Sequence, residues 1–106
     1  MNKIRQYGVH RLLHSLTMKE EQLQVLQIAD GCYCSSFSLD GEEAFTEWIG
    51  GTAILSYKSE MDFCLPLSCK DLMHELAQPQ NGNSVYVWHV EADEWHNGMV
   101  HHLKRL

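Results

Sequence analysis

The sequence predicts one small α+β domain over residues 1–106, with three to four helices packed on a mainly antiparallel sheet. The first observation is length, because 106 residues leave room for a single domain. The second is that helix-like and strand-like apolar patterns follow one another without an internal repeat. The third is that two neighbouring strand candidates are joined by a short turn, which favours antiparallel pairing.

Two helices are predicted before the first strand. The first rests on an apolar stripe at helical spacing, formed by Val9, Leu12, Leu13 and Leu16. The second begins at Thr17, which matches a capping box with Glu20, and it ends at Gly31. Residues 20–29 also fit a β-hairpin, because Asp30 and Gly31 together are a strong turn signal. Their content of Gln, Glu, Lys, Leu and Met favours the helix.

The middle of the chain is predicted to alternate strand and helix. Residues 32–39 form the first strand, with Tyr33 and Phe37 as its bulky members. Residues 42–48 are predicted as two helical turns, which the glycine pair at 50–51 would end. Residues 52–57 and 61–65 are then predicted as an antiparallel hairpin.

The last third of the chain carries a clear helix start and a clear strand. Ser68 is a suitable N-cap, and Asp71 would lie favourably in the first turn of the helix that follows. Residues 79–83 are predicted to be a loop, and residues 84–90 a strand. Residues 97–106 fit either a helix or a strand, and the pattern leaves both open.

The charged residues are segregated along the chain. All 14 acidic residues lie between Glu20 and Glu94, where only Lys58 and Lys70 oppose them. Both ends are basic, although the formal net charge is −6. A strongly acidic middle segment disfavours phosphate chemistry there and favours a basic partner.

The N-terminus lacks the apolar run of a signal peptide, and apolar stretches are too short to cross a bilayer. We therefore expect a cytoplasmic protein without membrane contact and without a cofactor. In a reducing compartment its four cysteines are thiols. A zinc site is the weaker alternative, because the spacing only partly matches the usual pairs of zinc ligands; its residues would be Cys32, Cys34, Cys64 and Cys69.

Our favoured functional hypothesis is a non-catalytic protein-binding module that inhibits or regulates a basic partner. Such a partner would be a nuclease toxin, as for an immunity protein, or a nucleic-acid-handling complex. Five acidic residues are predicted to attract the basic partner electrostatically, namely Glu42, Glu43, Glu47, Glu60 and Asp62. Two tryptophans, Trp48 and Trp95, are predicted to anchor it in the interface. The competing interpretation places Trp48 in the core and leaves the acids to keep the protein in solution. Formation of a homo-oligomer is left open.

Two other functions compete with protein binding. A small histidine-dependent hydrolase or nuclease would use His89 and His96 as acid and base, near the carboxylates of residues 91–94. A nucleic-acid-binding regulator would use the basic ends of the chain, namely Lys3, Arg5, Arg11, Lys19, Lys104 and Arg105. Nucleic acid is the less favoured partner, because the acidic body opposes it.

Overall fold

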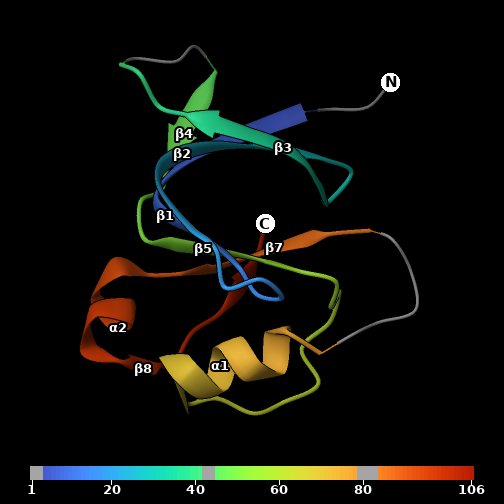
Figure 1. Cartoon of the computed structure of the whole chain (residues 1–106), viewed down its shortest axis with the longest axis vertical. Coiled ribbons are helices and arrows are strands. Elements are labelled where there is room, and N and C mark those ends of the chain that lie inside the picture. Colours follow the sequence, from blue (N-terminus) through green and yellow to red (C-terminus); the bar gives the residue numbers. More distant parts are fainter. Residues whose placement is uncertain (1–3, 42–44, 79–83) are drawn as a thin grey trace.

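The computed structural model describes residues 4–41, 45–78 and 84–106 (Figure 1). Its elements are, in order, β1 (Ile4–His14), β2 (Glu20–Ala29), β3 (Cys32–Ser38), β4 (Thr46–Trp48), β5 (Thr52–Ser56), β6 (Leu67–Ser68), α1 (Cys69–Leu76), β7 (Tyr86–Val90), α2 (Ala92–Asn97), β8 (Met99–Val100) and β9 (Lys104–Arg105). Strands are far more common than helices among these residues. The main sheet is mixed and has seven strands, and there are two helices. The prediction of an α+β domain with three to four helices is therefore wrong.

The first predicted helix is the long strand β1. Its apolar residues imitate a helical stripe because the strand is buried on both faces: Leu12 belongs to one core and Leu13 to another. A strand covered on both sides does not show the simple apolar–polar alternation that identifies a half-exposed strand.

The second predicted helix is also a strand, and the hairpin alternative is the correct one. β2 pairs antiparallel with β1 from Ile4–Ala29 to Leu13–Glu20. At its other end Asp30 and Gly31 both have positive φ, 54° and 79°, as a tight two-residue hairpin turn requires. Backbone pairing on both edges thus outweighs the weak helix propensity of the glutamine-rich sequence.

Two further predictions in the middle of the chain are wrong. Within residues 42–48, Thr46–Trp48 is the strand β4 rather than a helix, while residues 42–44 lie outside the described residues. Residues 61–65 form no strand, so the hairpin with residues 52–57 does not exist. Instead β5 pairs parallel with β1 and antiparallel with β7.

The strands β3, β5 and β7 confirm three of the predicted strands, and α1 confirms the predicted helix start. The Ser68 side chain accepts a hydrogen bond from the Asp71 backbone N–H at 3.0 Å, as an N-cap should. The predicted loop at residues 79–83 lies outside the described residues. At the end of the chain, which the sequence left open, α2 ends at Asn97 and the residues after it form the short strands β8 and β9 rather than a helix.

The sheet has the order β3-β2-β1-β5-β7-β9, with β4 pairing beside β1 ahead of β5. It curls on itself, because the Tyr33 N–H at the start of β3 donates to the Val85 carbonyl just before β7 at 2.7 Å. The curl encloses one core, with Val9, Leu26 and Val87 among its buried members. A second core lies between the outside of β5 and β7 and the helix α1 (Figure 1).

Two buried serines attach α1 to the sheet. Ser15 and Ser56 both donate to the carbonyl of Leu76, the last residue of α1, at 3.2 and 2.6 Å. They satisfy a carbonyl that the helix end leaves without an intrahelical partner. In the described parts of the chain, neither helix is long and apolar enough to span a membrane.

A buried lysine lies just after β5. Only 3% of Lys58 is exposed, and its ammonium group bonds the Asp62 carboxylate at 2.6 Å. The carbonyl of Lys58 accepts the indole N–H of Trp88 at 2.9 Å. The bond to the ammonium group lowers the pKa of Asp62 below its ordinary value. Asp62 is thus the counterion of a buried charge.

We expect Asp62→Asn to destabilise the fold more than Lys58→Met does. The first change leaves a buried ammonium without a counterion, whereas the second replaces it with an apolar side chain of similar length. Urea denaturation midpoints of both variants and of Lys58→Met/Asp62→Asn test this. The double variant should be as stable as Lys58→Met, and a double variant as unstable as Asp62→Asn would contradict the counterion role.

Candidate functional site

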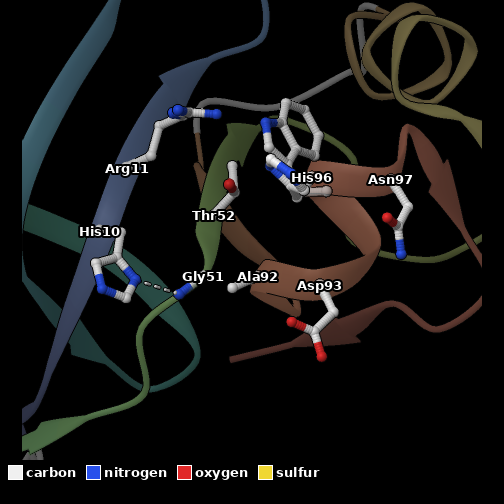
Figure 2. Close-up of a pocket in the computed structure, with 9 residues that line it drawn as sticks. His10, Arg11, Gly51, Thr52, Ala92, Asp93, His96 and Asn97 are labelled. Atoms are coloured by element: carbon white, nitrogen blue, oxygen red, sulfur yellow. Dashed lines mark hydrogen bonds between the residues drawn. The ribbon is translucent and has the colours of Figure 1, made fainter.

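The candidate site is a hollow of about 480 Å³ between β1, the start of β5 and α2 (Figure 2). His10 and Arg11 come from β1 on one side, and Asp93, His96 and Asn97 from α2 on the other. The segment Gly51–Thr52 lies between the two groups. The hollow thus joins residues from opposite ends of the sequence.

Gly51 lies at the floor of the hollow, directly after a second glycine, Gly50. Gly50 and Gly51 have φ values of 64° and 66°, a backbone conformation that glycine adopts without steric cost. This bend separates β4 from β5, which both run parallel to β1. It also directs the Gly51 N–H at the His10 ring, whose Nδ1 accepts the hydrogen bond at 3.1 Å. His10 is thereby held at one side of the hollow.

Trp48 does not line the hollow itself but lies beside His10, which does. The two rings meet edge to face, with centroids 4.8 Å apart and planes at 86°. A Cβ atom at Gly8 would lie 2.6 Å from the Trp48 ring, so the missing side chain at Gly8 makes room for the indole. Trp48 is 49% exposed although it is fixed on both sides. A rigid, half-exposed tryptophan is a typical anchor in protein interfaces.

The electrostatics of the hollow favour a cation. The Nε atom of Arg11 lies 2.6 Å from the Glu20 carboxylate, so the positive charge of Arg11 is balanced. Asp93 also lines the hollow, and it forms no ion pair with any residue that the structure describes. An incoming cation would therefore meet an uncompensated carboxylate next to the partly buried ring of Trp95.

Glu94 fixes the position of α2. Its carboxylate accepts hydrogen bonds from the backbone N–H groups of His101 and His102 and contacts the His102 ring at 2.9 Å. These bonds, with the His102 ring as the largest contributor, lower the pKa of Glu94 from 4.5 to about 2. Glu94 therefore joins α2 to the segment that follows β8 and keeps the neighbouring Asp93 in place.

The structure distributes the predicted partner-binding residues over distant places. Trp95 lines the hollow, Trp48 lies behind His10 at its side, and Glu47 is exposed on β4. Glu60 and Asp62 follow β5, whereas Glu47 precedes it, so the two groups lie at opposite ends of that strand. Glu42 and Glu43 lie outside the described residues. The acids therefore do not converge into one field in the described structure.

The two histidines of the hydrolase hypothesis line different cavities. His96 is exposed in the hollow, whereas His89 lies on β7, is 7% exposed and bonds the Gly50 carbonyl at 2.8 Å through Nε2. The polypeptide at Gly50 and Gly51 lies beside the His89 ring. The structure thus does not bring His89 and His96 together as an acid–base pair.

The cysteines lie in two regions. Cys32 and Cys34 are on β3, while Cys64 and Cys69 lie before and at the start of α1, and all four are free thiols. Burial raises the pKa of the Cys69 thiol, which disfavours the thiolate that zinc requires. Over residues 4–41, 45–78 and 84–106, no three His, Cys, Asp or Glu side chains gather as a metal site would need.

Several cations of the basic ends already have partners. Arg11 pairs with Glu20, and Lys19 with Glu21 at 3.4 Å. Arg105 donates to the Ser59 carbonyl at 2.6 Å. Arg5 and Lys104 line a cavity at the far end of β1. Lys3 lies outside the described residues.

Sequence reasoning did not bring the residues of the hollow together, among them His10, Arg11, Thr52 and Asp93. The glycine pair at 50–51 was the available signal, because two adjacent glycines mark a sharp bend or a close backbone approach.

Comparison of the chain with protein-family models, curated proteins and solved structures found no match.

Proposed function

We propose that the chain is a non-catalytic protein-binding module that captures a basic partner through the hollow between β1, β5 and α2. The observation that carries this proposal is that a rigid, half-exposed Trp48 lies beside His10, next to a hollow whose lining includes the exposed carboxylate of Asp93. An arginine or lysine of the partner would enter the hollow, meet Asp93 and lie against an indole ring.

The charge of the whole chain supports a basic partner over an acidic one. A net charge of −6 attracts a basic protein over a distance and raises its association rate. A partner with a basic nucleic-acid-binding cleft, such as a nuclease toxin, would be inhibited when this module covers that cleft. A cytoplasmic location belongs to the same proposal, and free thiols are the cysteine state expected there.

A nona-arginine peptide is a suitable first probe. In a titration followed by NMR, we expect the largest shifts at His10, Asp93 and the indole N–H groups of Trp48 and Trp95, with affinity falling as salt rises. Trp48→Ala should raise Kd about thirtyfold, as loss of an interface anchor does. Asp93→Asn should raise Kd and weaken the salt dependence.

Glu60→Gln is the matched control, because it removes one exposed acid at the other end of β5. Its affinity for the peptide should equal that of the parent chain. Equal weakening by Glu60→Gln and Asp93→Asn would show unspecific attraction to the acidic surface and would sink the proposal. A protein captured from a cell extract counts as the partner only if Trp48→Ala bait fails to retain it.

A further inference from the structure

A second cavity, of about 420 Å³, opens at the end of the sheet where β1, β4, β7 and β9 come together. Two pairs in the strand register position its lining: Tyr7 lies opposite Glu47, and His89 opposite Lys104. Opposite residues share one face of a sheet, so these four side chains lie on the side of the enclosed core. The cavity is therefore the mouth of the curled sheet, separate from the hollow beside α2.

Four charged side chains surround this mouth, and they are of both signs. Arg5 and Lys104 are the cations, and Glu47 and Glu91 are the carboxylates. None of the four is within ion-pair distance of an opposite charge in the described ranges. Arg5 nevertheless forms a hydrogen bond with Tyr7 and is attracted by Glu47 across the mouth. By contrast, Arg11, Lys19 and Lys58 each pair with a neighbouring carboxylate. The cavity thus holds two positive and two negative charges, none of them tied up in a close ion pair.

The rest of the lining is largely apolar and firmly held. Tyr7, Ile49 and Leu106 are partly buried and pack against the enclosed core. His89 is buried beside them, and its bond to the Gly50 carbonyl fixes the ring. The lining is therefore polar for the most part, with one apolar portion formed by these side chains. The mouth of a curled sheet is a common place for a small-molecule site.

A ligand with a single charge would match only half of this site. An anion bound by Arg5 and Lys104 would be repelled by the nearby Glu47 and Glu91, and a cation bound by these carboxylates would be repelled by Arg5 and Lys104. A small zwitterion satisfies both pairs within one cavity. An apolar side chain on that zwitterion would also bury itself against Tyr7, Ile49 and Leu106.

We infer that the mouth of the curled sheet binds a free α-amino acid with an apolar side chain. Arg5 and Lys104 hold its carboxylate, Glu47 and Glu91 hold its ammonium group, and the apolar portion of the lining takes the side chain. This site is independent of the proposed capture of a basic protein, which uses the hollow beside α2.

Three related probes test the inference by NMR titration of the full chain. L-leucine carries both charges, N-acetyl-L-leucine lacks the ammonium group, and L-leucinamide lacks the carboxylate. We expect L-leucine to shift the signals of Tyr7, Ile49 and His89, and each of the other two to bind at least about tenfold more weakly, since each loses a charge-assisted contact. Equal binding of all three probes overturns the inference, as does the absence of shifts up to the solubility limit of leucine.

Charge-removing variants inside and outside the mouth test whether L-leucine binds at this site or is attracted by the charged surface in general. Arg5→Met and Glu47→Gln should each raise the Kd for L-leucine about tenfold. Lys70→Met and Glu60→Gln remove the same kinds of charge at exposed positions away from the mouth and should leave the Kd unchanged. A loss of affinity in these two controls as large as in the site variants would also overturn the inference. The dispersion of the amide signals shows for each variant whether the fold is intact.

Discussion

Gly51→Ala is expected to lower the free energy of unfolding by about 3 kcal/mol or more, because a strained backbone and a steric clash act together. Gly51 has a φ of +66°, which disfavours any residue with a Cβ atom. The added Cβ would lie 2.4 Å from the Val90 carbonyl oxygen and 2.9 Å from the His89 ring. The carbonyl belongs to the central strand β7 and cannot move without breaking its pairing with β5.

Gly98→Ala is the control that separates the two costs. Gly98 has a φ of +83° at the end of α2, and an added Cβ there would meet no atom within 4 Å. We expect Gly98→Ala to lower the free energy of unfolding by about 1 kcal/mol, because it adds only the backbone strain of a positive φ and no steric clash. Urea denaturation of both variants gives the comparison. If Gly51→Ala were no more destabilising than Gly98→Ala, the close approach of β5 and β7 at the floor of the hollow would be wrong.

Glu94→Gln is expected to lower the free energy of unfolding by about 2 kcal/mol at neutral pH, because three hydrogen bonds lose their charged acceptor. The folded pKa of Glu94 is about 2, below the ordinary value of 4.5. A carboxyl with a depressed folded pKa stabilises the fold fully above its unfolded pKa. That contribution is lost as pH falls from about 4.5 toward about 2.

The measurement is the free energy of unfolding of the parent chain and of Glu94→Gln between pH 7 and pH 2. The difference between them should be largest at neutral pH and shrink on acidification. Glu60→Gln, at an exposed acid for which no ion pair is found in the described structure, should follow the parent curve. A constant difference from pH 7 to pH 2 would contradict the role of the Glu94 charge.

The local signals in the sequence were reliable where they depend on a few neighbouring residues. Ser68 and Asp71 set the start of α1 through one hydrogen bond between them. Asp30 and Gly31 turn the chain because both tolerate positive φ. The strands β3, β5 and β7 have the β-branched and aromatic content that a pleated surface favours. These features need no knowledge of the remote parts of the chain.

The identity of β1 and β2 could not be obtained in this way. Helix propensities differ by only a few tenths of a kcal/mol per residue, whereas pairing of β1 with β2, β4 and β5 satisfies the backbone along both edges. The partner strands lie far away in the sequence, and β1 is buried on both faces, so its apolar pattern resembles a helical stripe. Only the assembled sheet distinguishes the two.

The candidate sites show the same division. The sequence by itself determined the acidic charge balance. It proposed Trp48 as an anchor, and it marked the glycine pair at 50–51 only as the end of a predicted helix, where the structure has a strand and a bend. The tertiary structure decided which side chains meet: it placed His10 beside Trp48 and opposite Asp93, and it separated His89 from His96. It did so because β5 pairs parallel with β1 on one side and antiparallel with β7 on the other, contacts that have no local sequence signal. The helix α2, which follows β7, therefore lies across the start of β5 from β1.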